Sequence, residues 1–317
     1  MQYNNCILYS LNSKKKLVKI LIVNKNINKK KLVKIFSKEE QLKILIEKSK
    51  KVQLTDKKTR NKILNSTNIT FNENIHRQFT YAQKKSDYKM ILKKLSKILS
   101  IWVEKNNLNY LYSIIKNVDY VKNAYFHKEN NYFLKIDFKN YFNNISSLQI
   151  FNFFKYKLNT SIDIARILTV LSVADINNTN LKQGLETSPI LSFLVNIEIF
   201  EEIYQYCIEK KFKMSLYVDD LVISSKNPIN KKEIQFVFNI LIKNKLKINR
   251  RKIKYQNLYN NIVIITGIQI LKNHNLKPIN KTCKKLRIEK KISKNQNVIN
   301  GLISNLKYIQ QINDKNK

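Results

Sequence analysis

The spacing of apolar residues along the middle of the chain predicts a succession of helices and strands. Over residues 88–103 they recur every three or four positions with lysines between them, as on the buried face of an amphipathic helix. Residues 132–138 are mostly apolar with an acid near the end, which predicts a strand. Helices are predicted over 163–173 and over 188–210, the second with Pro189 in its first turn.

The pattern beyond these helices predicts a β-hairpin over 214–225, in which two apolar runs flank a polar turn. A helix over 231–245 and a strand over 262–271 follow, and from about residue 272 the chain is basic and is predicted to be helical. This order indicates an antiparallel sheet backed by helices, the α+β class. No glycine-rich strand-to-helix turn occurs, so neither a P-loop nor a doubly wound fold is supported.

Composition and charge add a polyanion as the expected partner. The chain has 317 residues and 43% hydrophobic content, enough for a large core and more than one lobe. Lys and Arg number 60 against 22 Asp and Glu, and the resulting net charge of +38 is spread along the whole chain. Nucleic acid is favoured over an anionic membrane surface, because the basic residues do not gather on one amphipathic helix. An AT-rich genome would also supply lysine without selection for charge.

The first 75 residues are Lys-rich and are predicted to be mostly helical. The heptapeptide Lys-Lys-Lys-Leu-Val-Lys-Ile occurs at 14–20 and at 29–35, which indicates two similar amphipathic segments and not a solenoid. The N-terminus lacks the pattern of a signal peptide, and no apolar run approaches the roughly 18 residues that span a bilayer. We therefore expect a cytoplasmic protein without a membrane partner. Three distant cysteines and three histidines offer no zinc site.

The candidate chemistry centres on two adjacent carboxylates, Asp219 and Asp220, at the turn of the predicted hairpin. From the tetrapeptide alone a metal site and a solvated turn are equally open, because adjacent acids repel without a cation while Asp is also common in turns. Asp137 ends another strand, so the three acids converge if these strands are neighbours. Such a site suits two Mg²⁺ ions and phosphoryl transfer onto a growing nucleic acid.

Four motifs in order make the chain resemble reverse transcriptases of the bacterial type over roughly residues 75–290. The first is an acid followed five residues later by an aromatic, at 137–142, and the second is a QGxxxSP sequence at 183–189. The third is a YxDD box at 217–220, and the fourth is a lysine-bearing sequence at 246–252. The resemblance implies an α+β right-hand polymerase fold with an antiparallel palm sheet, fingers and a helical thumb. The expected regions are a basic N-terminal helical region at 1–75, fingers and the start of the palm at 76–135, the palm at 136–271 and the thumb at 272–317.

The resemblance also implies roles for individual residues, with two Mg²⁺ ions as cofactor and deoxynucleoside triphosphates as substrates. The catalytic residues would be Asp137, Asp219, Asp220 and Lys252. The metal site would comprise Asp137, Phe138, Asp219 and Asp220, with Asp220 the less direct partner. The substrate would contact Phe138, Phe142, Gln183, Gly184, Lys84 and Lys85. Two other interpretations stay open: Phe142 as a core aromatic and not a steric gate, and Lys252 as a surface lysine.

Two shorter signatures are similar to those of retron reverse transcriptases. The sequence Asn-Ala-Tyr-Phe-His at 123–127 fits NAxxH, and Ile-Thr-Gly at 265–267 differs from VTG by one methyl group. The RNA-binding residues implied by these signatures and by a basic thumb helix are Asn123, His127, Thr266, Gly267, Lys284, Lys285 and Arg287. An ordinary hydrogen-bonded histidine and a merely solvated charged helix remain the alternatives.

The chain departs from the family in the finger segment that grips the triphosphate. The usual Pro-Lys strand and following basic residue are missing, and Lys84, Lys85 and Lys89 are the candidate substitutes. Lys182 also replaces the more usual proline before the QG pair, and Phe193 stands where asparagine is common. Triphosphate binding is therefore the part of the site that the resemblance supports least.

The retron resemblance implies a structured noncoding RNA that serves as template and primer, and a single-stranded DNA product covalently attached to it. It also implies a role in defence against phage with a separate effector protein. The alternatives are a group II intron-like or other bacterial reverse transcriptase, and a non-catalytic RNA-binding scaffold. A diversity-generating enzyme would be expected to have glutamine where this chain has Pro189.

Overall fold

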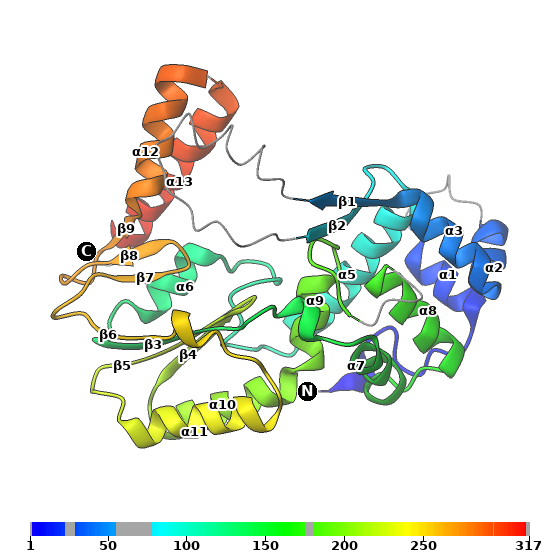
Figure 1. The fold of residues 1–317 in the computed structure, drawn as a ribbon, viewed down its shortest axis with the longest axis horizontal. Coiled ribbons are helices and arrows are strands. Elements are labelled where there is room, and N and C mark those ends of the chain that lie inside the picture. Colours follow the sequence, from blue (N-terminus) through cyan, green and yellow to red (C-terminus); the bar gives the residue numbers. More distant parts are fainter. Residues whose placement is uncertain (1, 23–28, 55–77, 175–179, 294, 315–317) are drawn as a thin grey trace. The chain divides into compact units, whose positions relative to one another are not determined.

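The computed structural model falls into two compact units, and each is built from two stretches of the chain (Figure 1). The described residues are 2–22, 29–54, 78–174, 180–293 and 295–314. Unit 1 comprises Met1–Asn107 and Asn140–Asn196, and unit 2 comprises Leu108–Lys139 and Ile197–Lys317. The four regions expected from the sequence stay a prediction, and the part of the N-terminal region at 55–77 lies outside the described residues.

Unit 1 begins with the two copies of the repeated heptapeptide, and both are helices. They form α1 (Lys14–Leu21) and α2 (Lys29–Ser37), each with its apolar residues buried on one side and its lysines outside. Ser13 caps α1 by accepting a hydrogen bond from the amide of Lys16. The prediction of two similar amphipathic segments is therefore confirmed.

A two-stranded antiparallel sheet and a long helix follow in unit 1. Helix α3 (Glu39–Ser49) leads into β1 (Lys50–Leu54), which pairs with β2 (Gln78–Ala82). The helix predicted over 88–103 is α5 (Asp87–Lys105), and its buried face includes the predicted apolar positions. The remaining elements of unit 1 are η1 (Tyr3–Asn5), η2 (Phe142–Asn144), α7 (Ser147–Asn152), η3 (Phe153–Lys157), α8 (Ile162–Val173) and α9 (Ser188–Val195).

Unit 2 is organised around a four-stranded antiparallel sheet with the strand order β4-β5-β3-β6. Its strands are β3 (Tyr132–Asp137), β4 (Lys213–Tyr217), β5 (Asp220–Ser225) and β6 (Lys254–Asn257). In Figure 1, helices α10 (Ile197–Glu209) and α11 (Lys231–Lys243) lie on one side of this sheet and α6 (Tyr120–His127) lies on the other. The predicted strand, hairpin and antiparallel sheet are all present.

The helix predicted over 188–210 is two helices, α9 and α10, which meet at Asn196. The Asn196 side chain donates a hydrogen bond to the carbonyl of Ser192 at 2.9 Å, and its backbone amide bonds to the carbonyl of Phe193 at 3.0 Å. These local bonds compete with the helical pattern and end α9. The prediction of one continuous helix was wrong, and the break coincides with the boundary between the two units.

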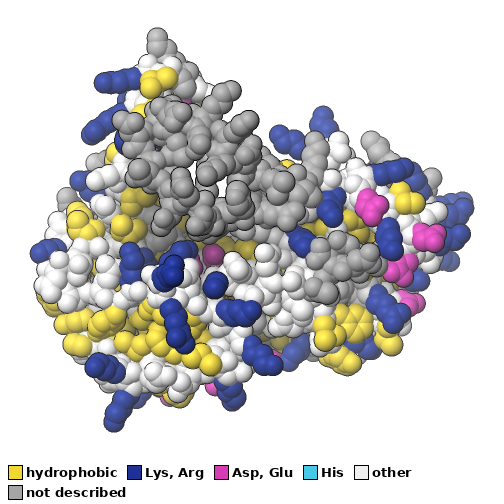
Figure 2. Space-filling view, viewed as in Figure 1, with side chains coloured by type: hydrophobic (Ala, Val, Ile, Leu, Met, Phe, Trp, Pro, Cys, Tyr) yellow, Lys and Arg dark blue, Asp and Glu magenta, His cyan; other side chains and the backbone are white. Residues whose placement is uncertain are grey.

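The strand predicted over 262–271 is a hairpin of two short strands. They are β7 (Val263–Ile265) and β8 (Ile268–Ile270), and a third strand, β9 (Leu276–Pro278), pairs with β8. The C-terminal region expected to be helical therefore begins with a strand and continues as α12 (Asn280–Ile288), η5 (Glu289–Ser293) and α13 (Gln296–Asp314). No helix in the described part of the chain is long and apolar enough to cross a membrane. On the face shown in Figure 2, Lys and Arg side chains are distributed over both units.

Candidate active site

The two adjacent acids lie at a tight turn between β4 and β5. Tyr217 and Asp220 are register partners, so Val218 and Asp219 form a two-residue loop. Val218 has a φ of 56°, a left-handed conformation that such loops require and that a β-branched residue adopts only under strain. The Val218 amide donates a hydrogen bond to Ser113 Oγ at 3.1 Å. Backbone strain held by tertiary contacts is typical of functional turns.

Asp137 lies directly across the sheet from this turn. It is the last residue of β3, where it is the register partner of Asp220. The amide of the next residue, Phe138, donates a hydrogen bond to the carbonyl of Asp219 at 3.1 Å. Asp137 is therefore paired with Asp220 of the hairpin, and the convergence of all three acid side chains stays a prediction.

Two side chains from the segment after α11 bind the Asp137 carboxylate. Lys252 Nζ lies 2.8 Å from Oδ1, and Asn249 Nδ2 donates to Oδ2 at 3.2 Å. The amide of Asn249 also donates to the carbonyl of Asp137 at 2.8 Å. The Lys252 side chain is 50% exposed against 18% for Asp137, so the lysine reaches in from solvent. Lys252 is therefore half-exposed and contacts the carboxylate of Asp137, and its catalytic role stays a prediction.

Asp137, Asp220 and Lys252 line a cavity of about 220 Å³ together with Lys135 and Lys254. The sequence interpretation missed the last two and Asn249. Lys135 could have been found, because residues two apart on a strand point to the same face and Lys135 precedes Asp137 by two. Asn249 and Lys254 reach the site through the tertiary fold, and no local pattern marks them.

The electrostatics of the cavity centre on Asp220. Burial, followed by the nearby charges of Asp219 and Asp137, raises the pKa of Asp220 to about 6. Burial likewise lowers the pKa of Lys135, against the opposing effect of Asp220. Burial thus disfavours the charged form of each group, a perturbation of the pKa that is frequent at functional sites and also occurs in structural ion-pair networks.

The donor chemistry of this cavity fits a hard divalent cation. Asp137 and Asp220 present carboxylate oxygens, which are the ligands that Mg²⁺ prefers. Among the described residues, no three His, Cys, Asp or Glu side chains are grouped closely enough to hold a metal ion. Lys252 and Asn249 bind the oxygens of Asp137 that such an ion would need.

The predicted QG pair lies in unit 1, beside strand β2. The amide of Thr80 donates to the carbonyl of Gln183 at 2.9 Å. Gly184 has a φ of 107°, and a Cβ there would lie 2.7 Å from the Thr80 carbonyl oxygen. Only glycine fits this close approach. Lys84 and Lys85, the candidate triphosphate ligands, are exposed in the turn after β2.

Three other predicted residues have definite environments. Phe138 is buried, with its ring centroid 5.9 Å from that of Phe200 in unit 2. Phe142 is half-buried in unit 1 beside the ring of Tyr141, so the core and steric-gate interpretations both remain open. Lys89 forms an ion pair with Glu186 at 2.9 Å and therefore already has a structural role.

His127 is completely buried and joins α6 to the strands that carry the acid pair. Its ring nitrogens contact Ser224 Oγ of β5 at 2.6 Å and Ser215 Oγ of β4 at 2.7 Å. Burial, with Lys213 nearby, lowers its pKa to about 3, so the ring is neutral. Asn123 is also fully buried, and its side-chain atoms Nδ2 and Oδ1 have no hydrogen-bond partner in the described part of the chain. Neither side chain is placed to touch RNA directly, and their RNA-binding role stays a prediction.

The second retron-like signature forms the turn between β7 and β8. Thr266 and Gly267 have φ angles of 46° and 85°, as a two-residue hairpin loop with two left-handed residues requires. Thr266 Oγ1 donates to the carbonyl of Tyr120 at 2.7 Å, which fixes the turn against the start of α6. The basic thumb residues are exposed along α12: Lys284, Lys285 and Arg287.

Residues 76–270 match the family described as "Reverse transcriptase (RNA-dependent DNA polymerase)", and the chain belongs to this family. Members of the family use divalent metal ions. The predicted fold class is confirmed: an α+β right-hand polymerase fold with an antiparallel palm sheet, fingers and a helical thumb.

A curated relative is the retron Ec83 reverse transcriptase of Escherichia coli, which is 28% identical over 187 residues. The match covers 51% of this chain and 54% of the relative, so the chain spans about half the length of the relative it matches. The predicted resemblance to retron-type reverse transcriptases is thereby confirmed.

Solved structures of two yeast telomerases are also similar to this chain. The telomerase of Candida tropicalis truncated from its C-terminal domain has a TM-score of 0.46 at 12% identity, covering 64% of this chain and 52% of that one. The telomerase of Candida albicans with a fragment of telomeric RNA has a TM-score of 0.47 at 11% identity, covering 84% and 62%. The family assignment rests on the sequence match and not on these structures.

Proposed function

We propose that this chain is an RNA-directed DNA polymerase that copies a structured noncoding RNA into DNA covalently linked to that RNA. The observation that carries the proposal is the pairing of Asp137 with Asp220 across the sheet, beside Asp219 and in one cavity with Lys252. Carboxylates held this way at a strand end and a strained turn match the chemistry of nucleotidyl transfer. The family assignment makes RNA the template and deoxynucleoside triphosphates the substrates of the proposal.

The residues of the cavity would divide the work by charge. Two Mg²⁺ ions, when bound, activate the attacking hydroxyl and neutralise the leaving pyrophosphate. Asp137 and Asp219 would be the main ligands, and Asp220 the less direct one. Lys252 donates to Asp137 Oδ1 and would supply positive charge to the pyrophosphate.

Nucleotide selection would fall to residues of unit 1. Phe142 would pack against the sugar and leave no room for a 2′-hydroxyl. Gly184 exposes backbone beside β2, where the incoming nucleotide could approach closely. Lys84 and Lys85 would bind the triphosphate as mobile point charges, because no arginine is available in this segment.

The retron lineage extends the proposal to priming and partners. Similarity to the retron Ec83 enzyme supports a cognate noncoding RNA that provides template and primer, with DNA synthesis started from an RNA 2′-hydroxyl. We include in the proposal a separate effector protein and a role in defence against phage. Protein purified from its native host should then carry a branched RNA–DNA species, and nucleic acid destroyed by RNase alone would contradict this part.

Primer extension tests the polymerase activity directly. The wild-type chain should extend a primer on an RNA template with deoxynucleotides and Mg²⁺, and Asp219→Asn should lose at least about a hundredfold in rate. Asp163→Asn is the matched control, since Asp163 has a 65% exposed side chain in unit 1. Extension that survives in Asp219→Asn refutes the mechanism. A wild-type chain that binds RNA without extending a primer would instead be a scaffold.

A further inference from the structure

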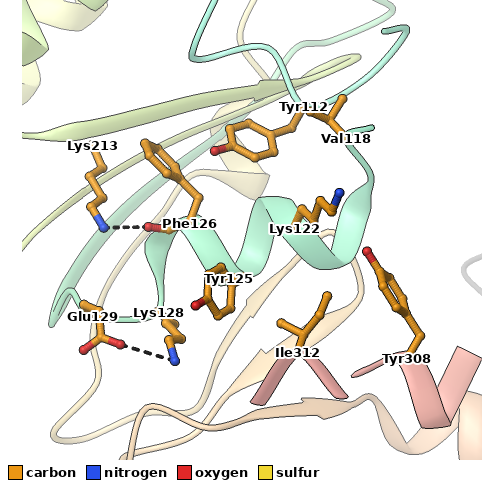
Figure 3. Close-up of a pocket in the computed structure, with 10 residues that line it drawn as sticks. All are labelled: Tyr112, Val118, Lys122, Tyr125, Phe126, Lys128, Glu129, Lys213, Tyr308 and Ile312. Carbon is orange, nitrogen blue, oxygen red and sulfur yellow. Dashed lines mark hydrogen bonds and ion pairs between the residues drawn. The ribbon is translucent and has the colours of Figure 1, made fainter. Parts of the chain in front are cut away.

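A second cavity, of about 700 Å³, lies in unit 2 along the outward side of α6 (Figure 3). Four aromatic rings line it, from the segment before α6, from α6 itself and from α13: Tyr112, Tyr125, Phe126 and Tyr308. Tyr112 and Phe126 lie with ring centroids 5.2 Å apart. The catalytic carboxylates line a different cavity, so these rings belong to another site.

The same cavity is lined by three lysines and one acid. Lys122 and Lys128 come from α6 and the residue after it, and Lys213 begins β4. Lys128 pairs with Glu129 at 3.4 Å, while Lys213 donates to the carbonyl of Phe126 at 2.8 Å, as Figure 3 shows. Lys122 Nζ donates to the carbonyl of Asn117 at 2.6 Å, and the ammonium groups of Lys128 and Lys213 lie 4.7 and 5.1 Å from the ring centroids of Tyr125 and Phe126. The lining therefore favours an anionic ligand.

One carboxylate fixes the two helices that form the walls. Asp119 caps α6 with Oδ1, which accepts hydrogen bonds from the amides of Val121 and Lys122 at 2.8 and 2.9 Å. Its other oxygen, Oδ2, accepts a hydrogen bond from the Tyr308 hydroxyl of α13 at 2.7 Å. The aromatic walls are thus held in place before any ligand arrives, which lowers the entropic cost of binding.

We propose that this cavity binds an unpaired nucleotide of an RNA. The rings that line the cavity take a flat nucleobase by stacking, and its lysines take the adjoining phosphates. The site is chemically distinct from the cavity of Asp137 and Asp220, which has no aromatic lining. The inference rests on the proposed function only for the choice of RNA as the partner, because an enzyme that copies RNA must bind an RNA.

An apolar peptide is the competing occupant, and the charges argue against it. The lining carries three lysines against Glu129, within a chain of net charge +38. An uncharged peptide would add to the desolvation of these lysines without adding a charged partner, whereas a phosphate adds one. We therefore propose RNA as the occupant, and a negative result in the tests below would favour a protein partner.

Photocrosslinking tests the site in the wild-type chain without any mutation. A short single-stranded RNA containing 4-thiouridine should crosslink, on irradiation, to the tryptic peptide of residues 123–128, which carries Tyr125 and Phe126. A duplex RNA of the same sequence should compete poorly, since its bases are not free to stack. Crosslinks that map only elsewhere in the chain overturn the proposal.

Affinity measurements supply the second readout. Tyr125→Ala should weaken binding of the same single-stranded RNA about tenfold, while Tyr125→Phe keeps the ring and should stay within about twofold. Tyr259→Ala is the matched control, because Tyr259 is 59% exposed outside the cavity. Lys122→Glu should weaken binding and reduce its salt dependence, and Lys232→Glu on exposed α11 is its control. Equal affinity of wild type and Tyr125→Ala refutes the site.

The two proposals fail separately. A wild-type chain that crosslinks at residues 123–128 but extends no primer refutes the polymerase and leaves the nucleotide site standing. A wild-type chain that extends primers but gives no crosslink there refutes the nucleotide site and leaves the polymerase standing.

Discussion

Replacing Asp220 by asparagine should stabilise the folded chain at about pH 8 even though it alters the proposed active site. The reason lies in the surroundings of this carboxyl. It is partly buried at the hairpin, adjacent to Asp219 and opposite Asp137, and its pKa is raised to about 6 from 3.8. The folded chain therefore disfavours the ionised form that predominates at neutral pH, and asparagine removes that charge with nearly the same shape.

The magnitude follows from the pKa and its direction. A carboxyl whose pKa is higher in the folded state binds more protons when folded, so the wild-type chain loses stability as pH rises from 3.8 through about 6. At about 1.36 kcal/mol per pKa unit the full penalty is about 3 kcal/mol above that range. The asparagine amide must find new hydrogen bonds, so a gain of about 1–3 kcal/mol is expected for Asp220→Asn. At about pH 5 the gain should be about half as large.

Thermal and urea unfolding followed by circular dichroism, with EDTA present, measure this gain at both pH values. Asp163→Asn, in an exposed position of unit 1, should change stability little at either pH and is the control. Added Mg²⁺ should stabilise the wild-type chain more than Asp220→Asn, because a bound cation relieves the repulsion. A variant that is less stable than wild type at about pH 8, or equally stabilised at both pH values, refutes the reasoning.

Three further predictions test other contacts. Gly184→Ala should destabilise the chain by about 1–3 kcal/mol in a thermal melt, because its Cβ would lie 2.7 Å from the Thr80 carbonyl; an unchanged melt contradicts the close approach. His127→Leu removes the histidine partner of the Ser215 hydroxyl and leaves Ser224 Oγ with the hydrogen bond from Asn130 Nδ2, and it should cost about 2–4 kcal/mol. Because the pKa of His127 is lowered to about 3 in the folded chain, the wild type should also lose stability as pH falls below about 6.5. If His127→Leu loses stability over the same pH range, His127 is not the cause of that loss. Lys252→Gln removes the ammonium group from Asp137 Oδ1 while Asn249 still donates to Oδ2, and it should tighten Mn²⁺ binding, measured by paramagnetic resonance, about threefold or more while slowing extension; weaker binding would show that the lysine does not compete.

Elements with a strong local pattern were predictable from the sequence. The helix over 88–103 and the hairpin over 214–225 have apolar periodicities that leave one arrangement of buried faces. The break at Asn196 was not, because it depends on a side-chain bond that only the formed helix offers. The turn at Thr266 and Gly267 was not predicted, because apolar residues on both sides of it read as one strand. The glycine within that run was the available signal of a break in the strand.

The part of the candidate site that was predictable from the sequence is the part that strand pairing alone determines. Asp137 and Asp220 meet because each terminates a strand of one antiparallel pair. Burial, the largest cause of the raised pKa of Asp220, depends on the fold, as do the positions of Lys135 and Lys252, which oppose that rise. Sequence patterns identify the acids, whereas their protonation and their competing partners are properties of the packed structure.

Helix α6 relates the proposed nucleotide cavity to the carboxylate site through its two sides. The positions that the signature NAxxH specifies, Asn123, Ala124 and His127, face inward, and His127 braces the strands that carry Asp219 and Asp220. The two positions that the signature leaves open are Tyr125 and Phe126, which line the cavity. One side of α6 therefore hydrogen-bonds the sheet, while the other lines the cavity proposed to bind RNA. A nucleotide bound against Tyr125 and Phe126 would contact the same helix whose His127 hydrogen-bonds Ser215 of β4 and Ser224 of β5, the two strands joined by the turn at Asp219, so the proposed RNA site and the proposed carboxylate site share one helix.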